Sequence, residues 1–280
     1  MKDYLDALRE QLTLRRFTAT TSRTYLNSVR YFLRWLDRNG RPLTKGAVVD
    51  FLLYMVNERH IAPGTQHTYL MSIRFFARRV VSQPELVAGI PPPKARIHPP
   101  IVPSRTQVRL LLLGMTQLRF RLMLMFAYGA GLRISEICNL QVSDIDLERQ
   151  VVYVRSGKGQ RPRVVMLGRL LGASVAKLLA ERSISSPWLF PGKNAVHPTH
   201  PRTLQTHVAR ARAGAGLGSR FRCHSLRHAF ATHLMESGVD LVTIQTLLGH
   251  ANIRATIRYL HVTTARIEQT PSPLDALALP

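Results

Sequence analysis

A single tyrosine follows a Gly-His pair near the C-terminal end of the chain, in the stretch LLGHANIRATIRYLH. Tyr259 comes nine residues after His250, among further arginine and histidine side chains that can hold an anion. A tyrosine hydroxyl can act as a nucleophile when its proton is removed or its anion is stabilised. The spacing therefore raises the question of which anion this tyrosine meets.

Two earlier segments carry residues of the same kind. Arg133 lies in GAGLRISEICNLQVSDID, and His224 and Arg227 lie in HSLRHAFATHL. Arg133 and Tyr259 would each have an ordinary structural role if they were considered alone. Arg133 would pair with Glu136 at the start of a helix, and Tyr259 would be a core tyrosine with its hydroxyl at the surface.

Three histidines near Arg227 are of a type that can bind a metal ion. His224 and His228 are four residues apart, which places both on one face of a helix, and His233 follows. Zinc would still require a carboxylate or cysteine within reach, so no metal site and no cofactor are expected. His228 is interpreted instead as a buried, hydrogen-bonded structural histidine.

The charge of the chain points to a polyanionic partner. Lys and Arg number 39 against 16 Asp and Glu, which gives a net charge of +23. Arginine predominates, and its planar guanidinium suits bidentate phosphate contacts, so nucleic acid is the leading partner. The alternative is a basic surface with no polyanion. No apolar run is long enough to span a bilayer, so we expect a cytoplasmic, nucleoid-associated protein without membrane contact.

The first part of the chain is expected to be all helical. Residues 2–16 predict an opening helix, and Val29, Phe32, Leu33 and Leu36 recur at helical spacing before the Asn39-Gly40 stop. Two more helical patterns begin near Thr44 and Thr65. We assign residues 1–86 to a helical domain and residues 87–103, which hold six prolines, to a linker.

The second part is expected to be mainly α with a small β-hairpin. Helical patterns start at Ser104 and cover FRLMLMFAYGAG and RISEICNLQ. VVYVRSGKGQRPRVVML holds two β-branched runs joined by a turn with Gly157 and Gly159, which is a hairpin signal. From Thr203 the chain is again mostly helical. Residues 104–268 form the second domain and residues 269–280 a C-terminal tail.

The ordered set of Arg133, Lys158, His224-x-x-Arg227, Gly249-His250 and Tyr259 resembles the tyrosine recombinase (phage integrase) family of XerC/XerD-like enzymes. The resemblance covers the whole second domain, and the first domain fits the family's core-binding domain by architecture only. A lone arginine, or His-x-x-Arg alone, would be a weak signal. The resemblance implies a site-specific recombinase that cuts and rejoins DNA.

Arginine can supply the positive charge that such a reaction needs. Attack on a phosphodiester builds negative charge on the non-bridging oxygens. Many nucleases meet this charge with Mg²⁺ held by clustered carboxylates, but few acids stand near these basic motifs. Arg133 and Arg227 could meet it with their guanidinium groups instead.

The resemblance assigns the remaining roles. Tyr259 is the nucleophile, His224 the general base or proton acceptor, and His250 a hydrogen-bond donor to the scissile phosphate. Lys158 at the hairpin tip is the general acid for the departing 5′-oxygen. Alternatively, Lys158 is a solvated turn residue, and Arg155, Arg161 or Arg163 takes its role as general acid.

The expected partner is double-stranded DNA gripped by both domains, and the resemblance implies a homo-tetramer on two paired sites. Whether an accessory DNA-bending protein or a partner recombinase takes part stays open. Rival functions are a catalytically silent DNA-binding protein of the same fold and a type IB topoisomerase. The arginines expected to contact DNA are Arg23, Arg30, Arg34, Arg74, Arg78, Arg79, Arg161 and Arg163.

Overall fold

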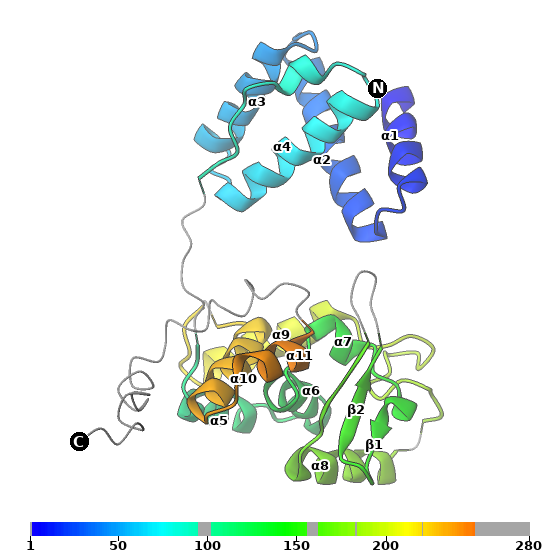
Figure 1. The fold of residues 1–280 in the computed structure, drawn as a ribbon, viewed down its shortest axis with the longest axis vertical. Coiled ribbons are helices and arrows are strands. Elements are labelled where there is room, and N and C mark those ends of the chain that lie inside the picture. The colour runs from blue at the N-terminus through cyan, green and yellow to red at the C-terminus, as the bar shows by residue number, and fades with distance from the viewer. Residues whose placement is uncertain (1, 95–101, 156–161, 183, 220, 250–280) are drawn as a thin grey trace, which may run out of the picture. The chain divides into compact units, whose positions relative to one another are not determined.

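The computed structural model describes residues 2–94, 102–155, 162–182, 184–219 and 221–249 (Figure 1). Contacts between residues divide the chain into two units, Met1–His98 and Pro99–Pro280. The division falls inside the proline-rich segment 87–103. Each unit has its own hydrophobic core.

The first unit is helical, as expected. Its helices are α1 (Lys2–Leu14), α2 (Ala19–Arg38), α3 (Lys45–Asn57), α4 (Pro63–Arg79) and the short 3-10 helix η1 (Pro84–Val87). Local sequence explains where they begin. Thr18 and Thr44 accept hydrogen bonds from Thr21 N and Ala47 N in the first turns of α2 and α3, and Pro63 occupies the first position of α4.

Aromatic side chains fill the core of this unit. Phe32, Phe51 and Phe76, from α2, α3 and α4, are completely buried. Leu86 and Val87 of η1 are also buried in this core, and Ile90 packs against it. The first unit therefore extends past residue 86, into the segment interpreted as a linker.

The second unit combines helices with one small sheet. Its helices are α5 (Arg105–Leu113), α6 (Leu118–Gly129), α7 (Ile134–Cys138), α8 (Arg169–Ala180), α9 (Pro201–Gly214), α10 (Cys223–Glu236) and α11 (Leu241–Leu248), with the 3-10 helix η2 (Val142–Asp144) before the first strand. Helix α6 is buried among α5, α8, α9 and α10. The unbroken apolar run over residues 122–127 follows from this position, because this part of the helix is packed on all sides.

The sheet is antiparallel with the order β1 (Ile145–Asp146), β2 (Val151–Val154) and β3 (Arg163–Met166) (Figure 1). Val154 pairs with Arg163 and Val151 with Met166, which confirms the predicted hairpin. Val152, Val154 and Val165 are buried, whereas Tyr153 and Val164 between them are exposed. This alternation lets one face of the sheet join the core.

Within the described residues, no helix combines the length and apolarity that a membrane crossing requires. Cys138 and Cys223 are both free thiols.

Candidate active site

A glycine turn brings Arg133 against helix α10. Helix α6 ends at Gly129, and Gly131 has a φ of +64°, which side chains other than glycine rarely adopt. A Cβ at Gly131 would lie 2.5 Å from the ring of Phe230 on α10. The turn therefore requires glycine for both its backbone conformation and its close approach. Arg133 follows as the residue that begins helix α7.

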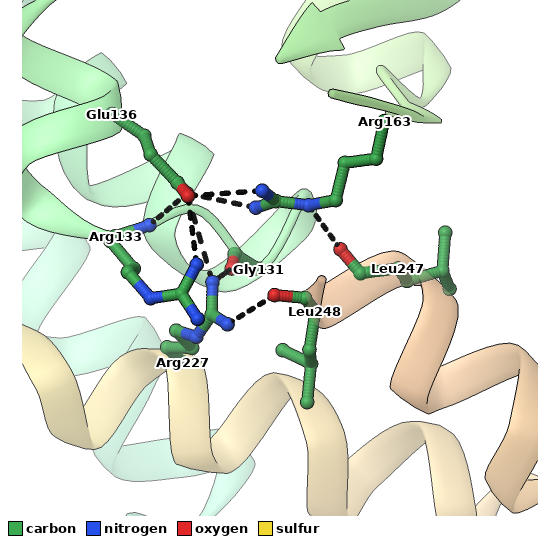
Figure 2. A network of polar contacts seen from close by, with 7 residues as sticks. All are labelled: Gly131, Arg133, Glu136, Arg163, Arg227, Leu247 and Leu248. Carbon is green, nitrogen blue, oxygen red and sulfur yellow. Dashed lines mark hydrogen bonds and ion pairs between the residues drawn. The ribbon is translucent and has the colours of Figure 1, made fainter. Parts of the chain in front are cut away.

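The carboxylate of Glu136, one turn into α7, is the centre of a network of arginines (Figure 2). Its Oε2 accepts hydrogen bonds from the backbone N–H of Arg133 at 2.8 Å and from Nη2 of Arg163 at 2.8 Å. Its Oε1 accepts from Nη1 of Arg133 at 2.9 Å and from Nη1 of Arg163 at 3.0 Å. One carboxylate therefore fixes two guanidinium groups. The ion pair left as the alternative for Arg133 is present.

Arg227 reaches the same carboxylate from helix α10. Its Nη1 lies 3.7 Å from Oε2 of Glu136 and donates to the carbonyl of Gly131 at 2.5 Å. Its Nη2 donates to the carbonyl of Leu248 at 2.5 Å. The side chain is only 2% exposed. Hydrogen bonds to the α6–α7 turn and to the end of α11 therefore fix the orientation of the buried Arg227 guanidinium.

The histidines of α10 occupy different surroundings. His224 is exposed on the first turn, and its ring meets that of half-buried His228 edge to face, with centroids 4.5 Å apart. His233 lies within hydrogen-bond distance of Tyr128, with Nδ1 3.0 Å from the hydroxyl oxygen. In the part of the chain that the structure describes, no group of three or more His, Cys, Asp or Glu side chains is arranged to hold a metal ion.

The predicted set is thus only partly visible. Arg133 and Arg227 lie together around Glu136, and His224 is one helical turn before Arg227. Lys158, Arg161, His250 and Tyr259 lie outside the described residues. Sequence reasoning named Glu136 only as a salt-bridge partner of Arg133. Glu136 lies three residues after Arg133 at the start of a helix, and this spacing is the one local feature of the sequence that indicates its role as the centre of the arginine network.

The structure places Arg163 away from its expected role at the DNA. Its side chain is only 5% exposed, and its guanidinium is bonded to Glu136 and to the carbonyl of Leu247. A side chain enclosed in this way has no surface for a phosphate. The structure argues against Arg163 as a DNA contact, because tertiary packing turns the first residue of β3 inward.

The expected DNA-contacting arginines of the first unit fall into two groups. The first group is exposed on α2 and α4 and consists of Arg23, Arg34, Arg78 and Arg79. The second is half-buried: Arg30 donates to Oδ1 of Asn27 at 3.0 Å, and Arg74 donates to the carbonyl of Ile90. The first group is the better placed to meet a partner.

Comparison with known proteins identifies the family. The model described as the Phage integrase family matches residues 106–266, which is more than half of the chain. The chain belongs to the phage integrase family. A second model, the phage integrase N-terminal SAM-like domain, matches residues 4–85 of the same chain. The helical first unit of this integrase-family chain therefore also has a family counterpart, which the sequence had indicated by architecture only.

Curated relatives of this integrase-family chain are recombinases. An integrase/recombinase of Escherichia coli is 32% identical, with 98% of this chain and 93% of the relative covered. A tyrosine recombinase XerA of Thermococcus kodakarensis is 33% identical, with 89% and 87% covered. The chain is accordingly a tyrosine-type site-specific recombinase, as the sequence predicted.

Solved structures agree on the fold. A crystal structure of a XerA recombinase matches with a TM-score of 0.55 at 25% identity and covers 96% of each chain. The XerH recombinase in a post-cleavage complex with palindromic difH substrate matches with a TM-score of 0.74 at 21% identity, covering 93% of this chain and 82% of that one. The α+β arrangement of this integrase-family chain is therefore that of known recombinases.

Cys223 stands beside His224 but is a poor nucleophile. Burial raises the pKa of its thiol to about 12. The thiol is therefore protonated at neutral pH, whereas a reactive cysteine needs a low pKa and access to solvent. Cys223 accordingly offers no thiolate at this site.

The arginines around Glu136 change its ionisation. Burial alone raises the pKa of its carboxyl, but hydrogen bonds from Arg163 and from the Arg133 N–H, with the charges of Arg163 and Arg227, lower it to about 2. A carboxyl whose pKa is lower in the folded state stabilises the fold above its unfolded pKa near 4.5. This stabilisation is lost as the pH falls from there toward 2. The whole shift corresponds to about 3 kcal/mol.

We expect Glu136→Gln to remove this pH dependence. At neutral pH the variant should unfold more easily by about 3 to 5 kcal/mol, because several buried guanidiniums lose their carboxylate. Between pH 6 and pH 3.5 the difference in free energy of unfolding from wild type should shrink by about 1 kcal/mol. Denaturant unfolding of both full chains across this range measures it. A constant difference would show that Glu136 titrates normally in the folded protein.

Proposed function

We propose that this recombinase cuts and rejoins DNA strands through a covalent 3′-phosphotyrosyl bond to Tyr259, without a metal ion or ATP. The phenol oxygen attacks the phosphorus, its proton passes to His224, and the bond from phosphorus to the 5′-oxygen breaks. A second 5′-hydroxyl then attacks the tyrosyl ester and reverses the step. The energy of the broken bond is kept in the ester, so no ATP is consumed.

The arrangement of Arg133 and Arg227 around one carboxylate is the observation that carries this proposal. Their chain segments are 94 residues apart, yet both guanidiniums lie beside Glu136, with Arg133 hydrogen-bonded to its carboxylate and Arg227 held by the carbonyls of Gly131 and Leu248. Donors fixed in advance stabilise developing charge without having to reorganise during the reaction. Together with Arg163 they place three guanidinium groups around the carboxylate of Glu136 within the described part of the chain. A cluster of guanidinium groups suits a phosphate.

The remaining roles follow the order of the residues along the chain. His224 is exposed at the start of α10, and it serves as proton acceptor. Lys158 protonates the departing 5′-oxygen, and His250 donates a hydrogen bond to the phosphate. His250 comes directly after Gly249, the left-handed residue that ends α11.

Double-stranded DNA is the partner, and it is bound by both units. Exposed Arg23, Arg34, Arg78 and Arg79 of the first unit contact phosphates, which position the protein without reading sequence. Four subunits assemble on two paired sites, with or without an accessory protein. A structure of lambda integrase, described as a dimer bound to a COC′ core site, has the same fold with a TM-score of 0.73 at 18% identity, covering 91% of this chain and 96% of that one.

Metal independence is the test of this function. We expect the rate of covalent adduct formation on a nicked suicide substrate, made from DNA flanking the gene, to be equal in EDTA and in Mg²⁺, because Arg133 and Arg227 supply the positive charge. Single-turnover assays resolved on denaturing gels measure it. Strict dependence on Mg²⁺ would exclude the proposed chemistry. Relaxation of supercoils without strand exchange would favour a topoisomerase, and tight binding without an adduct a silent DNA-binding protein.

A further inference from the structure

Arg163 joins three parts of the catalytic unit through one side chain (Figure 2). It is the first residue of strand β3. Its Nη1 and Nη2 make a two-pronged contact with Glu136 of α7, at 3.0 and 2.8 Å. Its Nε donates to the carbonyl of Leu247 at 2.7 Å, in the last turn of α11. The guanidinium therefore connects β3, α7 and α11.

The contact with α11 continues to the end of that helix. Gly249 has a φ of +61° and ends α11 in the left-handed conformation. A Cβ at Gly249 would lie 3.0 Å from Cδ and 3.1 Å from Nη1 of Arg163. The arginine is thus packed against the backbone of Gly249 as well as bonded to the preceding turn. Its side chain is only 5% exposed.

These three elements are the ones that lead to the proposed reacting groups. Helix α7 begins at Arg133, α11 is followed by Gly249 and His250, and β3 starts five residues after Lys158. Arg227 ties two of the same parts together, since it bonds to Gly131 and Leu248. Two neighbouring carbonyls at the end of α11, those of Leu247 and Leu248, are therefore each held by a different arginine.

We propose that Arg163 is a positioning residue for strand cleavage. It holds β3 and the end of α11 in a fixed position relative to the segment with Arg133 and Glu136, and it acts through these elements, not by binding the phosphate. This inference rests on the proposed function. It adds a residue that acts through the others and that the set of Arg133, Lys158, His224, Arg227, His250 and Tyr259 does not include.

Arginine suits this role because of its shape. The planar guanidinium presents its two Nη groups to Glu136 and its Nε to Leu247 in one rigid fork. A lysine keeps the charge but offers a single nitrogen, which cannot span the carboxylate and the carbonyl with the same geometry. Arg163→Lys therefore tests whether cleavage needs only the positive charge at this position or also the hydrogen-bonding geometry of arginine.

The test is single-turnover cleavage of the nicked substrate at saturating full-length protein. The rate constant reports the geometry of the folded site, and the amplitude reports how much protein is folded. Arg163→Met is expected to lower the rate constant by about 100-fold, the size of effect that a small misplacement far from the chemistry can cause. Arg163→Lys should fall between Arg163→Met and wild type. DNA affinity should stay near that of wild type for both variants.

Arg149→Gln is the matched control, because it removes an exposed arginine from the β1–β2 turn of the same sheet. It should keep the wild-type rate constant. If Arg163→Lys and Arg163→Met lower only the amplitude and the melting temperature, Arg163 is merely structural and the inference is overturned. Should Arg163→Met fail to fold, the rate constant of Arg163→Lys decides alone. If wild type itself forms no adduct, the proposed function fails, and this inference fails with it.

Discussion

Arg227→Ala is expected to slow strand cleavage by about 100- to 1000-fold, the loss typical of removing one donor that stabilises a transition state. Arg227 is held by the carbonyls of Gly131 and Leu248 and lies beside Glu136, so its direction is set before DNA binds. Single-turnover adduct formation at saturating protein measures the change, and DNA affinity should fall much less.

The same substitution also removes a buried charge from the network. The melting temperature of Arg227→Ala should therefore be lower than that of wild type, and the assay must be run below it. Lys177→Ala is the control, since it deletes a positive charge whose side chain is 66% exposed on α8. It should react at the wild-type rate. Folded Arg227→Ala with a wild-type rate constant would remove Arg227 from the catalytic set.

Tyr259→Phe is expected to abolish the covalent adduct completely and to leave DNA binding nearly unchanged. Only the hydroxyl oxygen is lost, and that oxygen is the proposed nucleophile. Adduct formation on denaturing gels and affinity from gel shifts measure the two effects separately.

Tyr153→Phe provides the matched comparison for this change. Tyr153 is an exposed tyrosine of strand β2, so its variant loses the same atom from the same catalytic unit. It should form the adduct as wild type does. An adduct of normal yield from Tyr259→Phe would show that another group attacks the phosphate.

The helices of the first unit were predictable because their signals are local. Thr44 begins α3 and Asn39-Gly40 follows α2, as the sequence indicated. Helix α8 was missed. Its start has no side-chain cap at Gly168, and Gly172 interrupts the pattern where the side chain of Gln150 approaches. The approach of Gln150 is a tertiary contact, which the periodicity of the sequence does not contain.

In the candidate site, too, contacts between residues close in sequence were predictable, whereas contacts between distant residues were not. The ion pair of Arg133 with Glu136 spans three residues and was visible as an alternative in the sequence. The contact of Glu136 with Arg163 spans 27 residues, and that of Arg163 with Leu247 spans 84. An arginine beside a turn resembles any phosphate-binding arginine until its partners are known. Arg163 was therefore assigned to DNA, although the fold uses it internally.

The most direct test of the account is to identify the amino acid that carries the DNA. Wild-type protein is incubated with the nicked substrate in EDTA, the adduct is isolated under denaturing conditions and digested, and the nucleotide-bearing peptide is sequenced by mass spectrometry. We expect one modified peptide, with the 3′ phosphate of the cut strand esterified to the oxygen of Tyr259. A modification on any other residue, or a linkage to the 5′ end, would contradict it.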